Sequence, residues 1–448
     1  MDSTFSSLVS QHLNIKSFIS MQHLSSLIKE NTRFRVFDPT TTLYCFIFQI
    51  LSRCSCKGVI ANLNVQRKLS KQKLVSMNTS AYTQAKKRLS ESALRDIAFA
   101  SGQTSDAKAK IWKWKERNVE LIDGTVISLE DTLENKKKFP ITYAKGKAQG
   151  QPKLRLLGRF SHSSGSLVDA ELGKYVGKGQ SETTLIQKMI DRIKPFSILV
   201  LDRFFTNYFL QAMFLSNNLD YVIRARDQFA KRHLGKKKND IIVTIKKPHR
   251  SKHSNYDWDL APEFIKVRLI KSTIKRKGSR VAKVYIITSL FEESKADVEE
   301  LYLKRWGVEL DIRNLKTTLE ASLLRSKTPK MALKELWVSI IAYNLIRSIT
   351  VSTSNIYMDV PPRKRSFKTT ILVYLECIKS FGSRGYELIA ELLKGEILNA
   401  KYRREPRAIK KRNNRYCHLT VSRKESKNQN WGYSRRCGKA GLPKQMES

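Results

Sequence analysis

Residues 119–205 contain a series of short apolar runs that restricts the chain to a mixed α/β fold. The strand-like segments VELIDGTVISL, KLRLLGRFS and SLVDAELGKY precede a helical segment, ETTLIQKMIDRI, and a further strand-like segment, FSILVLDRFF. Three strands, a helix and a strand are typical of a mixed sheet covered by helices. The apolar run that ends at Leu201 is uninterrupted, so we expect a central strand buried on both faces.

The rest of the chain divides by its character. Residues 1–110 predict a helical N-terminal region, and residues 111–225 and 281–350 predict the two parts of the α/β body. Between these parts, residues 226–280 carry 17 Lys or Arg and five acids around β-like pieces, which predicts a basic β-strand insertion. Residues 351–448 predict a helical C-terminal region and a basic tail that forms an extended arm.

The charge of the chain points to a polyanionic partner. Against 84 Lys and Arg stand 40 Asp and Glu, which gives 448 residues a formal charge of +44. Nucleic acid is the expected partner, because neutralising phosphates releases counterions and supplies much of the non-specific affinity. No apolar run approaches the ~20 residues of a membrane span, and no secretory signal is evident. We therefore expect no membrane partner and a cytoplasmic location, associated with the nucleoid.

Two other residue types add no chemistry of their own. The six cysteines form no C-x-x-C pair, so we interpret them as reduced thiols. His249 and His253 are four residues apart, but the surrounding KKPHRSKHSNYDWD contains a proline and turn residues. This composition favours a solvated loop over a metal site.

The segment LYLKRWGVELDIRNLKTTLE, residues 301–320, predicts a helix with a charged stripe. Ser294 followed by Asp297 resembles a capping box at its start. On a helical wheel Tyr302, Arg305, Glu309, Arg313 and Lys316 fall within an arc of about 80°. The stripe adjoins the apolar face, so we expect Glu309 to be half-buried; the alternative is a solvated face with ion pairs such as Glu309 with Arg313.

Two aspartates follow apolar runs at predicted strand ends. Asp123 follows VELI, and Asp202 follows ILVL. Either one could be an ordinary turn or cap residue. If their strands are neighbours, however, the two carboxylates converge at an edge of the sheet where sites commonly form. Like charges at close range favour a cation between them, and hard oxygen ligands suit Mg²⁺ or Mn²⁺.

Together with Glu309, these aspartates could bind a pair of divalent ions. Such a pair can activate an attacking water or 3′-hydroxyl and stabilise the leaving oxygen of an in-line displacement at phosphorus. Arg305 and Lys316, on the stripe of the glutamate, could then hold phosphates that flank the scissile bond. The basic insertion and tail would supply the wider DNA track.

These residues resemble a known family, the DDE transposases of the insertion-sequence-four type. The hallmark of that family is Tyr, two residues, Arg, three residues, Glu, six residues and Lys, and Tyr302, Arg305, Glu309 and Lys316 reproduce every interval. LIDGTVISLEDT resembles the box of the first family aspartate, and LVLDRFFTN resembles the box of the second. ELWVSIIAYNLIR and RREPRAIKKR are similar to C-terminal segments of the family.

The resemblance implies an RNase H-like catalytic core with an all-β insertion between the second and third acids. It also implies Asp123, Asp202 and Glu309 as catalytic ligands of two Mg²⁺ ions, for which Mn²⁺ can substitute. Members cut DNA at terminal inverted repeats and join the element to target DNA in cut-and-paste transposition, acting as homodimers on paired ends. The N-terminal region of the family binds the inverted repeats, so the resemblance implies that residues 1–110 form a helical DNA-binding region.

The resemblance further implies DNA contacts by Tyr302 and Arg305, and Arg313 and Lys316 on the same stripe are further candidates for DNA contact. In its hairpin mechanism a flipped base stacks on an aromatic residue. Trp258, the tryptophan of the insertion, is the candidate for that stack, and packing inside a small β domain is the alternative. Two other functions stay open: a non-catalytic DNA-binding protein derived from a transposase, and a metal-dependent nuclease or resolvase.

Overall fold

The computed structural model describes residues 36–144, 147–235, 238–249, 258–274, 282–381, 385–398, 431–433 and 440–443. The predicted C-terminal arm lies largely outside the described residues. The helices are α4 (Pro39–Ser52), α5 (Cys56–Leu69), α6 (Ser80–Arg88), α7 (Glu91–Lys108), α8 (Leu133–Lys138), α9 (Glu182–Gln187), α10 (Tyr208–Ser216), α11 (Asp227–Leu234), α12 (Lys295–Lys304), α13 (Trp306–Arg313), α14 (Pro329–Tyr357), α15 (Phe367–Phe381) and α16 (Gly385–Leu393).

Most strands join one nine-stranded mixed sheet, whose path is β5-β4-β1-β6-β7-β10-β9-β8, with β11 paired to β1. These strands are β1 (Val119–Leu129), β4 (Lys153–Ser161), β5 (Leu167–Lys174), β6 (Ile198–Leu201), β7 (Asp220–Arg224), β8 (Asp240–Lys246), β9 (Phe264–Ile274), β10 (Ala282–Thr288) and β11 (Leu323–Leu324). β1 is antiparallel to β4 and parallel to β6, and β6 is parallel to β7. Two small hairpins lie outside this sheet, β2 (Thr142–Ala144) with β3 (Lys147–Gln149), and β12 (Trp431–Tyr433) with β13 (Ala440–Pro443).

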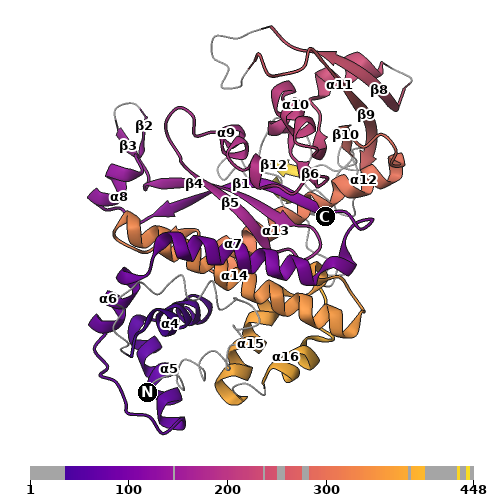
Figure 1. Ribbon diagram of the computed structural model, residues 1–448. Helices are drawn as coiled ribbons and strands as arrows, with labels where there is room; N and C mark the ends of the chain where they lie inside the picture. Colours follow the sequence, from indigo (N-terminus) through magenta and orange to yellow (C-terminus); the bar gives the residue numbers. More distant parts are fainter. Residues whose placement is uncertain are drawn as a thin grey trace, which may run out of the picture.

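Helices cover both faces of the sheet. α7 and α14 cross one face, whereas α9 and α10 lie over the other (Figure 1). The strand β6 explains why both faces are closed: Ile198 and Val200 point to one core, and Leu199 and Leu201 point to the second. All four side chains are fully buried. The prediction of a central strand covered on both faces is therefore confirmed.

The 29-residue helix α14 is the centre of the first core. It is long and apolar enough to cross a membrane by length and composition, but 94% of its apolar window is buried inside the protein. Its neighbours are α7, α4, α15 and α16. The apolar residues of LWVSIIAYNLIRSIT predict a core helix, and α14 confirms this prediction.

The basic insertion differs from the all-β domain that was predicted. Residues 226–280 begin with the helix α11, and the strands β8 and β9 that follow extend the main sheet through β10. Side chains on one face of β9, Val267 and Leu269, join the core that also holds Ile223 of β7. The sequence pattern identified the strands correctly but could not show that their apolar face continues an existing sheet.

A histidine in the turn between β4 and β5 gives the fold a predictable pH dependence. Burial, together with the positive charges of Arg363 and Lys304, lowers the pKa of His162 to about 3. Its Nδ1 is shielded from solvent without a hydrogen-bond partner within the described structure. The folded protein therefore holds this ring neutral, whereas the unfolded chain takes up a proton below about pH 6.5.

We expect the free energy of unfolding to fall as the pH drops from about 6.5 toward 4, with His162 contributing about 1 kcal/mol per pH unit. Urea unfolding of the wild type and His162→Gln at a series of pH values measures this contribution. The variant should have the shallower slope over this range. Equal slopes would contradict the assignment.

Candidate active site

Asp123 and Asp202 lie on adjacent parallel strands at the same level. The register pairs Leu121 of β1 with Val200 of β6. Asp123 and Asp202 are each two residues further along, so they lie level with each other. Asp123 lies inside β1, not at its end as the sequence suggested, because β1 continues to Leu129 beside β4. Asp202 does end its strand. The structure thus brings the two predicted carboxylates together.

The electrostatics of Asp123 reflect this proximity. The pKa of the Asp123 carboxyl is raised to about 6, chiefly by burial and also by the negative charges of Asp202 and Glu182. A hydrogen bond from the Gly124 N–H, at 2.9 Å, and the positive charge of Arg305 act in the opposite direction. Asp123 is therefore held near several charged groups in a partly desolvated position, which is typical of a functional site.

Asp202 also has a local structural role. Its side chain caps the short helix η3 (Arg203–Phe205) and accepts a hydrogen bond from the Phe204 N–H at 2.7 Å. The alternative interpretation of Asp202 as a cap residue is thus correct, but the cap does not exclude a role in the site. One oxygen is engaged in this way, and the charge of the carboxyl still reaches Asp123.

The helix with the charged stripe is divided into three parts. α12 begins after Ser294, whose hydroxyl accepts from the Asp297 N–H at 3.1 Å, as the capping box predicted. Arg305 separates α12 from α13, and a π-helical turn, η4 (Asn314–Thr318), follows α13. A wheel at about 100° per residue holds through α13 but not through η4, because a π turn contains more residues. Lys316 lies in that turn, so its predicted alignment with Glu309 needs correction.

Glu309 is more exposed than predicted. Its side chain is 53% exposed, and it accepts an ion-paired hydrogen bond from Arg305 Nη2 at 2.7 Å. The ion-pair partner of Glu309 is thus Arg305 and not Arg313. Only 12% of the Arg305 side chain is exposed. Among the described residues, no group of three or more His, Cys, Asp or Glu side chains is arranged to hold a metal ion. Glu309 therefore reaches Asp123 only through Arg305 in this conformation.

The remaining predicted residues differ in accessibility. Tyr302 is only 2% exposed, and burial raises its pKa, while Arg305 and Arg224 lower it. Lys316 is partly buried, which lowers the pKa of its ammonium group. Arg313 is exposed on the surface. The phosphate-binding roles of these side chains stay predictions, and that of Tyr302 requires contact from a buried position.

Trp258 already has a partner on its ring. Lys247 Nζ lies 3.9 Å from the centroid of the indole, and the indole N–H donates to the Pro248 carbonyl oxygen at 2.9 Å. These contacts agree with the alternative of a packed tryptophan. Base stacking by Trp258 remains a prediction that requires displacing Lys247.

The sequence did not point to three residues of this region: Glu182 and Arg224 near the aspartates, and Trp306 beside Tyr302. Glu182 lies over Gly124, where an added Cβ would be 2.1 Å from its Oε1, and its charge reaches both aspartates. As the first residue of α9 it looked like an ordinary acid at a helix start. Trp306 lies against Tyr302 and Arg305, but nothing in its spacing distinguished it from a core aromatic residue.

Comparisons with known proteins place the chain in a family. A family model described as "Transposase DDE domain" matches residues 114–345, a range that includes Asp123, Asp202 and Glu309. The chain belongs to the DDE transposase family. The predicted resemblance is confirmed at this level.

This family member has a distant curated relative. "Transposase InsG for insertion sequence element IS4" of Escherichia coli (strain K12) is 25% identical over 348 residues, which cover 74% of this chain and 76% of the relative. A solved structure, "Cryo-EM structure of piggyBac transposase synaptic complex with hairpin DNA (SNHP)", aligns with a TM-score of 0.46 and 11% identity over 98% of this chain and 96% of that chain. We draw no functional argument from this structural similarity, because its TM-score is below 0.5.

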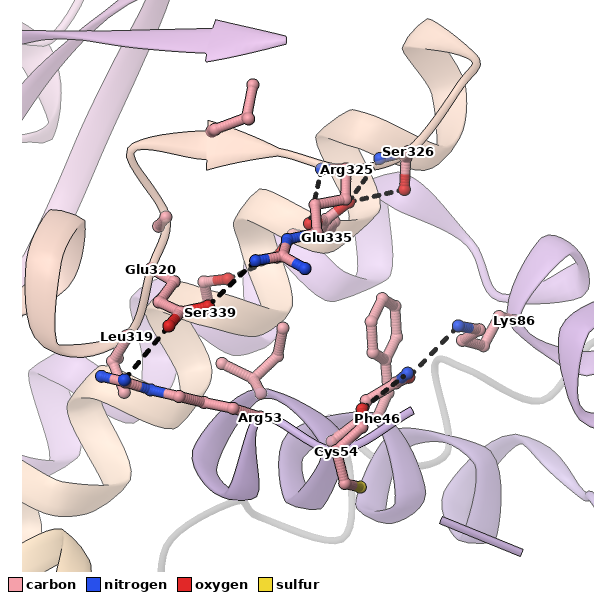
Figure 2. Close-up of a pocket in the computed structure, with 14 residues that line it drawn as sticks. Phe46, Arg53, Cys54, Lys86, Leu319, Glu320, Arg325, Ser326, Glu335 and Ser339 are labelled. Carbon is pink, nitrogen blue, oxygen red and sulfur yellow. Dashed lines mark hydrogen bonds and ion pairs between the residues drawn. The ribbon is translucent and has the colours of Figure 1, made fainter. Parts of the chain in front are cut away.

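The DDE transposase also has a cavity that is separate from the aspartates. It has a volume of about 250 Å³ and lies between α4 and α6 on one side and the η4–β11 segment and α14 on the other (Figure 2). Arg53 and Arg325 both pair with Glu320 at its rim, at 3.1 and 3.3 Å. Lys334 Nζ also donates to the Lys87 carbonyl oxygen at 2.7 Å. The N-terminal helices are thus fixed to the segment that follows the Glu309 helix.

Proposed function

We propose that this chain is an active DNA transposase that moves an insertion sequence by cutting and joining DNA strands. The observation that carries the proposal is the arrangement of Asp123 and Asp202, level with each other on adjacent strands, with Arg305 of the Tyr-Arg-Glu-Lys signature in electrostatic contact with Asp123. The family match and the relationship to InsG support the reaction class. The mixed order of β5, β4, β1, β6 and β7 supports an RNase H-like core.

DDE transposases generally use divalent metal ions. The carboxylate oxygens of the three acids are the type of ligand that such ions prefer. Asp123 and Asp202 offer hard oxygen ligands of like charge at one edge, which a cation would relieve. Glu309 would join them once its carboxylate leaves Arg305. When bound, Mg²⁺ or Mn²⁺ supplies positive charge that activates the attacking hydroxyl and stabilises the leaving oxygen.

The side chains of the protein would position the DNA for this chemistry. Arg305 is suited to hold a phosphate, because its Nε lacks a hydrogen-bond partner in the described structure and its guanidinium faces the carboxylates. Lys316 and Arg313 would contact the flanking backbone. The charge of +44 would draw double-stranded DNA, both the inverted repeats and the target, to a homodimer on paired ends.

Plasmid cleavage tests the proposal. A supercoiled plasmid that carries the DNA flanking both ends of the gene should be cut, and its element joined to target DNA, with Mg²⁺ but not with chelator. Asp202→Asn should abolish both steps, whereas Asp191→Asn, an exposed aspartate of the same core, should not. Binding without cutting would favour a transposase-derived DNA-binding protein. Cutting without joining would favour a nuclease or resolvase.

A further inference from the structure

Asp311 is a buried acid on the helix that carries Glu309. It is 1% exposed and pairs with two arginines: Oδ1 accepts from Arg347 Nη2 at 2.6 Å, and Oδ2 accepts from Arg363 Nη2. Neither arginine lies on α13, since Arg347 belongs to α14 and Arg363 to η5 (Pro362–Lys364). The turn of α13 is therefore tied to two separate elements through one carboxylate.

The partners of Asp311 also hold the strand pair that carries Asp123. Arg363 Nη1 donates to the Ser161 carbonyl oxygen at 2.7 Å, at the end of β4. The Tyr343 hydroxyl accepts from Arg347 Nε at 3.1 Å and lies 2.6 Å from the Gly165 carbonyl oxygen, to which it donates. β4 in turn pairs with β1, where Gly158 lies opposite Asp123. A short series of polar contacts thus joins α13 to the β1–β4 strand pair, which holds Asp123.

The helical geometry makes this connection directional. Asp311 is two residues after Glu309, which places it about 200° around the helix. Glu309 points to the open side, and Asp311 points into the protein. Fixing the buried side chain sets both the rotation of α13 and its position along the axis, and so determines where Glu309 projects.

Gly307 provides an independent indication that Arg363 lies close against this turn. An added Cβ at position 307 would be 2.7 Å from Arg363 Nη2. Any larger residue would displace the guanidinium group from its place beside α13. The absence of a side chain at position 307 therefore leaves room for Arg363 to reach Asp311.

We propose that Asp311, Arg347 and Arg363 form a clamp that positions Glu309 for catalysis. This inference rests on the proposed function, because it concerns the geometry of the third carboxylate. The three clamp residues are positioning residues and touch no substrate. Without the clamp, α13 keeps its apolar contacts through Val308 but loses the polar contacts that fix its rotation.

The test compares Asp311→Asn with Asp169→Asn. Asp169 is a matched control, because it is buried on β5 and also pairs with two arginines, Arg159 and Arg192. Both variants should lower the melting temperature. Single-turnover DNA cleavage per folded molecule should fall at least about 30-fold in Asp311→Asn and less than about threefold in Asp169→Asn, with unchanged affinity for DNA.

A binding measurement separates positioning from folding. Calorimetric titration of the protein bound to already-cleaved DNA ends should show at least about tenfold weaker Mn²⁺ binding in Asp311→Asn than in Asp169→Asn. Gly307→Ala should slow cleavage and lower the melting temperature less than Asp311→Asn does, since alanine favours a helix and the Arg347–Asp311 pair is kept.

The outcomes distinguish the two proposals. If the wild type neither cuts nor joins DNA, the proposed function fails. If the wild type is active but Asp311→Asn and Asp169→Asn lose cleavage and Mn²⁺ affinity equally, the clamp is wrong and Asp311 only stabilises the fold. Full activity in Gly307→Ala would also contradict the clamp.

Discussion

Replacing Asp123 by asparagine is expected to abolish DNA cleavage and, at the same time, to raise the melting temperature of the protein. Cleavage and joining should fall by at least about 10³-fold, equivalent to about 4 kcal/mol of transition-state stabilisation, because the variant loses one of the carboxylates proposed to hold the divalent ions. Single-turnover assays with Mg²⁺ measure this loss. Asp191→Asn serves as the exposed control.

The gain in stability follows from the sign of the pKa shift. Burial raises the pKa of Asp123 to about 6, so the folded state disfavours its carboxylate. The unfolded chain releases this proton near pH 4, and the wild type therefore loses stability as the pH rises from about 4 to 6. Asparagine removes the charge. The free energy of unfolding should therefore rise by about 1–2 kcal/mol at pH 7.5 in the presence of chelator, after allowance for partial exposure.

Thermal unfolding with chelator at pH 7.5 and pH 4 checks this prediction. Asp123→Asn should melt above the wild type at the higher pH, and the difference should shrink at the lower pH. A lower melting temperature for the variant at pH 7.5 would show that the carboxylate is favourably paired in the metal-free protein.

Asn344→Leu is expected to cause the largest loss of stability. Asn344 is fully buried in α14, and its amide nitrogen donates to the carbonyl oxygens of Ala98 and Leu167, both at 2.9 Å. Its oxygen accepts from the Leu167 N–H at 2.9 Å. Leucine has a similar size but would remove all three hydrogen bonds, and only the Ala98 carbonyl oxygen keeps a further side-chain donor, the Ser101 hydroxyl. The expected cost is about 3–5 kcal/mol, a large part of the stability of most domains.

Urea unfolding measures this cost, and Asn355→Leu is the matched control. Asn355 lies on the same helix, but its environment is only partly buried, and it bonds Trp112 and Lys108. We expect a loss of about 1 kcal/mol there. Equal losses for the two variants would show that burial of the Asn344 amide is not the decisive factor.

Much of the core could be predicted because its strands carry local patterns. β1, β4 and β9 begin and end where the apolar runs VELIDGTVISL, KLRLLGRFS and FIKVRLIKSTI do. The junction of these strands into one sheet could not be predicted, since strand pairing depends on contacts between distant residues. For this reason β8 and β9 were mistaken for a separate insertion.

The sequence could indicate the candidate residues of the site but not the contacts that they make. The spacing from Tyr302 to Lys316 identified the helix, and two apolar runs identified Asp123 and Asp202. The exposure of Glu309 could not be predicted, because it depends on Arg305 and on how α13 is anchored. The π turn that contains Lys316 could not be predicted either, because the spacing of the apolar residues does not distinguish one wider turn from a regular α-helix.

The contacts around the cavity in Figure 2 have a mechanical consequence. Arg53 pairs with Glu320, which lies just beyond the Glu309 helix. Outside the residues drawn there, the Lys87 carbonyl oxygen accepts a hydrogen bond from Lys334 of α14, so the N-terminal helices contact both elements. If the N-terminal helices recognise the inverted repeat, the protein would act as a molecular ruler. The distance between the recognised bases and the cut would then stay constant, even when the sequence between them changes.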